Sequence, residues 1–223
     1  MPKASVNGFR LHYEIEGHGE PVILIPGFAS GREIWSRQTS ALSLNFRVIT
    51  FDPRGVAASD KTDGAQSISV LADDVAHLLQ ALGIARAHIL GTSFGGFVAQ
   101  EFALKYPSMT NKLVLCCTSS GGANHVMPGA EALEVFASAR ALNTSQFEAA
   151  LSFDAESRVE EIRNPTLVVS GDADAFVPVE NSLNLAAKIP GAQLRIVEGG
   201  SHTFFIERAD EFNKLVTAFL CHL

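Results

Sequence analysis

The residues of this sequence that could carry chemistry are one serine, two aspartates and one histidine, and each stands directly after a strand-like apolar run. Ser93 lies in Gly-Thr-Ser-Phe-Gly, Asp172 and Asp174 follow one later run, and His202 follows the next. A serine hydroxyl is a weak nucleophile at neutral pH, so it needs a nearby base, and that base needs a carboxylate that fixes its tautomer. The sequence therefore predicts acyl transfer by Ser93 with His202 as the base and one of the two aspartates as its partner.

The segment around Ser93 predicts a sharp turn between a strand and a helix. The apolar residues 88–90 precede it, and the largely apolar segment 95–106 follows it with helical character. Gly91 and Gly95 flank the serine at a spacing of two residues, where larger side chains would collide with the strand and the helix. The helix N-terminus would then face the reacting centre, where its free N–H groups favour negative charge.

Strand-like and helical segments alternate along the rest of the chain. This alternation predicts right-handed crossovers and a mostly parallel sheet with helices on both faces. Asn7-Gly8 is typical of a hairpin turn, so we expect the first two strands to form an antiparallel edge. Expected strands are 4–6, 9–15, 22–25, 46–51, 88–90, 113–117, 166–169 and 193–197, and expected helices are 34–44, 67–82, 95–106, 180–189 and 210–220. The ligand site of such a sheet lies at the carboxyl ends of its strands.

Composition narrows the class of protein. The chain has 223 residues, 47% of them hydrophobic, and a net charge of −7, which argues against a nucleic-acid or anionic-membrane partner. The apolar runs are too short for a membrane span, and residues 1–4 lack an apolar signal core, so we expect a cytoplasmic protein. The three cysteines have neither metal-ligand nor disulfide spacing, and we expect them to act as small hydrophobic residues.

An ordered set of motifs resembles the α/β-hydrolase superfamily from the first hairpin to the last helix. In that fold the serine, the acid and the histidine follow one another in the order found here. The similar segments are the oxyanion turn at 26–28, the Asp-x-Arg-Gly loop at 52–55, the serine turn at 91–96, the acid loop at 171–178 and the histidine loop at 200–207. The register of the acid loop assigns Asp174, not Asp172, as the partner of His202. Two departures are Pro26, where many relatives have His, and Ala57, where relatives often have Gly.

The resemblance implies a fold and a site. The expected fold is an α/β-hydrolase domain over residues 1–223, with an eight-stranded, mostly parallel sheet and helices on both faces. Residues 121–164 would form a reduced helical cap, shorter than the cap of most relatives. The backbone N–H groups of Phe28 and Phe94 would bind the oxyanion, and Phe97, Val177 and Phe204 would line an apolar substrate pocket. No metal and no organic cofactor is needed for this chemistry.

Three functions remain open. The first is hydrolysis of carboxylic esters with small to medium acyl chains through an acyl-enzyme. The second uses the same triad of Ser93, Asp174 and His202 but acts on a lactone, an enol-lactone or a carbon–carbon bond. The third is a ligand-sensing protein without turnover. The short cap argues against this third function, because such proteins move their cap. A small cap also leaves the site more open, or covered by a second copy of the chain in a homodimer.

Overall fold

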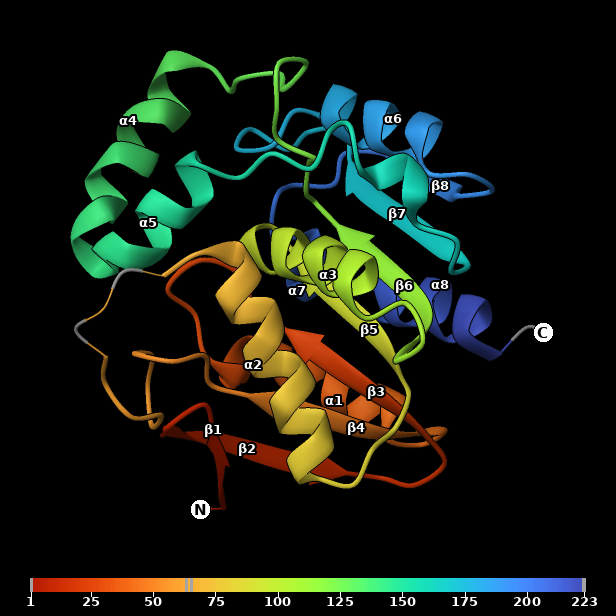
Figure 1. Cartoon of the computed structure of the whole chain (residues 1–223). Helices are drawn as coiled ribbons and strands as arrows, with labels where there is room; N and C mark the ends of the chain where they lie inside the picture. The colour runs from red at the N-terminus through yellow and green to blue at the C-terminus, as the bar shows by residue number, and fades with distance from the viewer. Residues whose placement is uncertain (1, 63, 65, 222–223) are drawn as a thin grey trace.

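One sheet forms the centre of the fold in the computed structural model (Figure 1). Over the described residues, which are 2–62, 64 and 66–221, the sheet has eight strands. Met1, His222 and Leu223, the ends of the domain predicted over 1–223, lie outside the described residues. The spatial order is β1 (Lys3–Val6), β2 (Phe9–Glu16), β4 (Phe46–Phe51), β3 (Glu20–Ile25), β5 (Ala87–Thr92), β6 (Thr110–Cys116), β7 (Thr166–Gly171) and β8 (Gln193–Val197).

The strand directions confirm the predicted mostly parallel sheet. Neighbouring strands from β4 to β8 pair in parallel, whereas β1 pairs antiparallel with β2, and β2 antiparallel with β4. The predicted Asn7-Gly8 turn joins the first two strands with positive φ at both residues. β5 and β7 are buried at every position, as expected of central strands that are covered on both faces. The carboxyl ends of the parallel strands therefore meet at one edge of the sheet.

Helices cover both faces of the sheet because its central strands carry apolar side chains on both. Ile23 and Ile25 pack on one face, and Val22 and Leu24 pack on the other. The first face is covered by α2 (Ile68–Ala81), α3 (Phe94–Lys105) and α6 (Val179–Lys188). The second is covered by α1 (Ser36–Leu42), α7 (Phe204–Glu207) and α8 (Ala209–Cys221), and Figure 1 shows α1 and α8 behind the sheet that α2 and α3 cover in front.

The helix boundaries follow local signals. The Ser67 hydroxyl accepts a hydrogen bond from the Val70 N–H at the start of α2, and Gly83 with φ +68° follows its end. The expected helix 34–44 is instead a 3-10 turn, η1 (Arg32–Trp35), continued by α1. The four-residue helix α7 is too short to show a helical apolar period and was not predicted from the sequence. No helix among the described residues has the length and apolar character needed to cross a bilayer.

The segment between β6 and β7 forms the small helical layer that the sequence predicted. It contains α4 (Ala130–Ala139), η2 (Arg140–Leu142), α5 (Thr144–Leu151) and η3 (Val159–Glu161). Figure 1 shows α4 and α5 at the end of the molecule where the parallel strands finish. A bridge between Gly121 and Asp154 joins the start of this segment to the residues that follow α5. We refer to residues 121–164 as the cap segment.

Candidate active site

Ser93 occupies the tight turn between β5 and α3. Its φ is +51°, a left-handed conformation that is unfavourable for a residue with a Cβ atom. The Ser93 N–H donates to the Cys116 carbonyl over 2.9 Å, and its carbonyl accepts from the Gly96 N–H at the same distance. Both flanking glycines are needed. A Cβ on Gly91 would lie 2.2 Å from the Gly95 carbonyl oxygen, and one on Gly95 would lie 2.3 Å from the Ile25 carbonyl oxygen. The turn thus presents the serine at the carboxyl edge of the sheet.

We expect Gly95→Ala to lower the free energy of unfolding by about 3 kcal/mol, because the new methyl group would meet backbone atoms of the neighbouring strand end. The gain in helix propensity from Gly to Ala, about 1 kcal/mol, offsets only part of this. Urea denaturation measures the change. Gly64→Ala is the matched control, since the atom nearest to its Cβ, in the Thr62 side chain, lies 3.8 Å away. Equal unfolding midpoints for the two variants would contradict the steric argument.

The structure brings the predicted serine, histidine and acid together. His202 Nε2 lies 3.1 Å from Ser93 Oγ, and His202 Nδ1 lies 2.8 Å from Asp174 Oδ2. The other carboxylate oxygen of Asp174 accepts from the N–H groups of Phe176 and Val177 at 2.9 and 2.8 Å. A carboxylate only accepts, so Nδ1 carries the proton and Nε2 offers its lone pair to the serine hydroxyl. This arrangement suits a serine that must lose its proton on attack.

Asp172, the other acid that the sequence left open, lies elsewhere. Its Oδ1 accepts from the Gly199 N–H over 2.6 Å in the loop after β8. Backbone contact joins the acid loop to the histidine loop: the Ala173 N–H donates to the Gly200 carbonyl over 3.0 Å, and a Cβ on Gly171 would lie 1.9 Å from that same oxygen. This contact fixes the separation of the acid and the histidine.

Glu207 stabilises the histidine loop by hydrogen bonds. Its carboxylate accepts from the hydroxyls of Ser201 at 2.8 Å and Thr203 at 2.6 Å, the two residues on either side of His202. The hydrogen bonds from Thr203 and Ser201 lower the pKa of Glu207, so the carboxylate is ionised at neutral pH. The sequence motif at 200–207 therefore has a structural reason.

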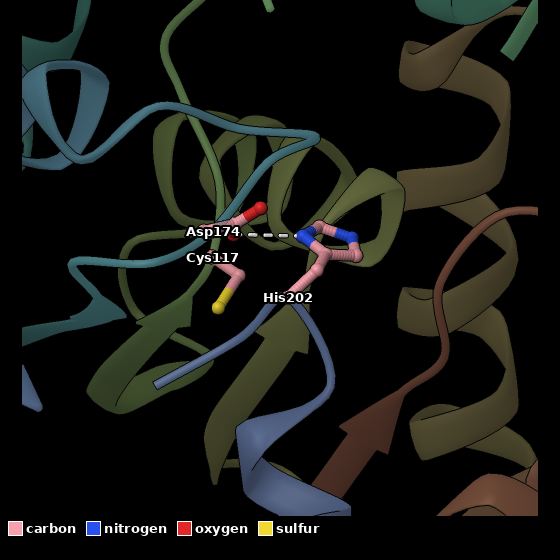
Figure 2. A group of neighbouring side chains, drawn as sticks. All are labelled: Cys117, Asp174 and His202. Atoms are coloured by element: carbon pink, nitrogen blue, oxygen red, sulfur yellow. Dashed lines mark hydrogen bonds and ion pairs between the residues drawn. The ribbon is translucent and has the colours of Figure 1, made fainter. Parts of the chain in front are cut away.

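A buried thiol lies beside the acid and the histidine (Figure 2). Donor atoms of Cys117, Asp174 and His202 all lie within 4.8 Å of one another, close enough to hold a metal ion between them. A hydrogen bond with the Cys116 thiol, together with burial, raises the pKa of Cys117 well above its usual range. A metal ion would have to deprotonate this thiol and displace the hydrogen bond between His202 and Asp174. The donor set therefore suits the hydrogen-bonded pair better than a metal.

A cavity of about 590 Å³ opens at Ser93. The cap segment supplies much of its wall, including Met127, Leu133, Phe136, Leu151 and Phe153, so the short cap still encloses part of the site. Of the three predicted pocket residues, Phe97 and Val177 line the cavity. The prediction for Phe204 was wrong: this side chain is fully buried against the α8 core, and its neighbour Phe205 lines the cavity instead. The helical turn of α7 directs adjacent side chains to different surroundings.

The cavity wall consists of apolar side chains and a few polar ones. Among the described residues that line it there is no Lys, Arg, Asp or Glu. The polar groups are hydroxyls of serine and threonine, His202 and His125. Burial lowers the pKa of His125, so its imidazole is neutral at pH 7. A charged substrate group would lose its hydration here without gaining an ionic partner.

The predicted oxyanion residues border the same cavity. Phe28 and Phe94 line it next to Ser93, and a Cβ built on Gly27 would lie 3.8 Å from the Ser93 Cβ. The turn after β3 and the first turn of α3 thus approach the nucleophile from two sides. The arrangement provides the elements of an acyl-transfer site, and the roles of the two N–H groups stay predictions.

This sheet, with a serine turn after the central strand, defines an α/β hydrolase. The chain belongs to the alpha/beta hydrolase fold family, whose model matches residues 20–151, and a second model, described as TAP-like protein, matches residues 137–222. The predicted superfamily and fold class are thereby confirmed.

Relatives along the full chain are hydrolases of several kinds. A protein of Azorhizobium caulinodans named "Putative carbamate hydrolase RutD" is 30% identical, with 98% of each chain covered. A 2-hydroxy-6-oxo-6-phenylhexa-2,4-dienoate hydrolase of Burkholderia cepacia is also 30% identical, over 97% of this chain and 93% of that one. The solved structure of the enol-lactonase from Burkholderia xenovorans has a TM-score of 0.86 and 29% identity, over 99% of this chain and 100% of that one.

The alignments also show a difference in length. The alignment with the Azorhizobium relative runs over 259 residues, whereas this chain has 223 in total. The relative therefore carries additional residues that have no counterpart here.

Proposed function

We propose that this protein is a serine hydrolase that cleaves uncharged carboxylic esters of small to medium acyl chains. The observation that carries the proposal is the apolar cavity at Ser93, whose described lining contains no Lys, Arg, Asp or Glu. Such a cavity favours an apolar acyl or alcohol group and disfavours a free carboxylate. Hydrolase relatives along the whole chain support the broader class.

The proposed mechanism uses the hydrogen-bonded chain of Ser93, His202 and Asp174. His202 Nε2 takes the proton of the Ser93 hydroxyl as its oxygen attacks the acyl carbon, and the imidazolium is stabilised by Asp174. The N–H groups of Phe28 and Phe94 would stabilise the oxyanion. The alcohol leaves with the proton from His202, and water activated by the same nitrogen then releases the acid from the acyl-enzyme.

A lactone is the second candidate substrate. A lactone is an uncharged cyclic ester, so the same cavity and the same steps apply, and the similarity to an enol-lactonase along nearly the whole chain favours it. Cleavage of a carbon–carbon bond is less favoured. The Burkholderia cepacia relative is named for a dienoate, which is a carboxylate, and the lining residues of this cavity include no cation to pair with one.

The test compares two p-nitrophenyl esters with five-carbon acyl chains, one ending in a methyl group and the other in a carboxylate. We expect kcat/KM for p-nitrophenyl valerate to exceed that for mono-p-nitrophenyl glutarate by about 100-fold, since the terminal carboxylate would be desolvated without a partner. An acetate-to-laurate series, γ- and δ-lactones, and the Ser93→Ala variant complete the panel. Equal rates for the neutral and anionic esters would overturn the substrate class. A single turnover with a retained adduct would instead favour a ligand-sensing protein.

A further inference from the structure

A buried glutamine of the cap segment forms a hydrogen bond with the predicted oxyanion turn. Gln146 lies on α5 with no exposed surface, and its Oε1 accepts a hydrogen bond from the Ala29 N–H over 2.8 Å. Ala29 directly follows Phe28, whose N–H is the predicted oxyanion donor. The two bonded residues are separated by 117 positions in the sequence. This hydrogen bond therefore couples the cap segment to the catalytic edge of the sheet.

The bonded N–H belongs to the peptide that decides the shape of the turn. The Gly27 carbonyl accepts from the Ser30 N–H at 3.3 Å, so Phe28 and Ala29 are the central residues of a four-residue turn. Ala29 has a φ of +52°. A positive φ at the second central residue is the mark of a type II turn, in which the central peptide is flipped relative to type I, and glycine is favoured there over alanine. Alanine alone would not hold this conformation well.

We propose that Gln146 is a positioning residue that holds the peptide between Phe28 and Ala29 in its flipped orientation. The proposal rests on the proposed function, because it gives Phe28 the role of oxyanion donor. If the central peptide reverses, φ of Ala29 becomes negative and ψ of Phe28 changes with it, while φ of Phe28 is the same in both turn types. The Phe28 carbonyl and the Ala29 N–H then exchange sides of the turn, and the turn that carries the Phe28 N–H loses the contact with Gln146 that holds it beside the nucleophile. Catalysis then loses part of the preorganised stabilisation of the oxyanion.

The surroundings of Gln146 make it suitable for this role. The Phe28 ring packs against Phe136 and Phe147 of the cap segment, with ring centroids 6.2 and 6.4 Å apart. The cap segment is also fixed at its base, where the Asn181 side chain on α6 bonds both the N–H and the carbonyl of Val126, at 2.9 and 2.8 Å. The acceptor on Gln146 is thus carried by a braced segment, which lets it hold the turn rather than follow it.

The side-chain amide of Gln146 is only partly satisfied by hydrogen bonds. Its Nε2 is buried and has no hydrogen-bond partner among the described residues. A buried amide group without an acceptor is unfavourable, and an apolar side chain of equal length would avoid that cost. The bond from Ala29 is therefore the contact that accounts for a glutamine at this position.

The test is a double-mutant cycle with Gln146→Met, which keeps the length of the side chain and removes the acceptor. We expect kcat for p-nitrophenyl valerate to fall about tenfold with KM changed less than about twofold. In the Ala29→Gly background, where positive φ carries no steric cost, Gln146→Met should lower kcat by less than about threefold. An equal fall in both backgrounds, or no fall in either, would overturn the proposal.

A control and a second readout separate positioning from loss of structure. Asn143→Ala removes the N-cap of α5, whose Oδ1 accepts from the Gln146 N–H at 3.1 Å, and leaves the Oε1 acceptor in place. If it lowers kcat as much as Gln146→Met, loosening of α5 explains the effect and the proposal fails. Hydrogen exchange of the Ala29 amide should accelerate at least about tenfold in Gln146→Met alone. Should the wild type hydrolyse no ester, the proposed function fails, and unchanged exchange at Ala29 would overturn the role of Gln146 as well.

Discussion

Replacement of Ser93 by alanine should lower kcat for ester hydrolysis by about 10⁴- to 10⁶-fold. The substitution removes the oxygen that would form the acyl-enzyme and leaves His202 Nε2, 3.1 Å away from it, without a proton to accept. Since the missing hydroxyl is one small group in a large cavity, KM should change little. The residual rate would come from water attack at a carbonyl that the oxyanion donors still polarise. Steady-state hydrolysis of p-nitrophenyl valerate measures the effect.

The matched control for this substitution is Ser170→Ala. Ser170 is another buried serine near the end of a central strand, but its Oγ has no hydrogen-bond partner among the described residues and it does not line the cavity. We expect kcat within about threefold of wild type for this control, as for a substitution remote from the chemistry. Similar thermal midpoints for both variants exclude unfolding as the cause. Wild-type kcat in Ser93→Ala would show that another group attacks the ester.

The serine turn at 91–96 could be predicted from the sequence because its steric constraints are local. Only glycine fits at Gly91 and Gly95, where a Cβ would lie 2.2 and 2.3 Å from backbone oxygens. The spacing of these glycines around Ser93 is therefore required by the tight turn between the strand and the helix. Because ligand sites lie at the carboxyl ends of parallel strands, His202 and Asp174 could be predicted to lie at the same edge of the sheet before any contact was known. The glycine spacing and the positions of polar residues after apolar runs can both be recognised in a single sequence.

The pocket was predicted less well because it depends on contacts that have no local sign. Phe204 and Phe205 are adjacent and of the same type, and only the orientation of the short helix α7 buries one and turns the other toward the cavity. The apolar residues of the cap segment are of the same types as those of a core helix. They line the cavity only because of the way α4 lies over the sheet. The bond from Ala29 to Gln146 spans 117 residues and joins two positions with no shared motif.

Asp174→Asn should lower kcat by about 10⁴-fold with little loss of stability. The carboxylate accepts from the N–H groups of Phe176 and Val177 through Oδ1, and the amide oxygen of asparagine would keep both bonds. That choice turns the amide NH₂ toward His202 Nδ1, 2.8 Å away in the wild type. An NH₂ group donates, so Nδ1 must offer its lone pair and the proton moves to Nε2. The histidine then presents N–H to Ser93 and cannot accept its proton.

Asp172→Asn is the control that separates the two acids of the 171–174 loop. Asp172 accepts from the Gly199 N–H, a bond that an asparagine oxygen retains, whereas His202 Nδ1 bonds Asp174. Its kcat should stay within about threefold of wild type, since the tautomer of His202 is untouched. If the large fall in kcat followed Asp172→Asn instead, the acid would be assigned to Asp172. A fall in both variants to the same level would point to damage of the shared loop, because only Asp174 reaches the imidazole through a hydrogen bond that asparagine reverses.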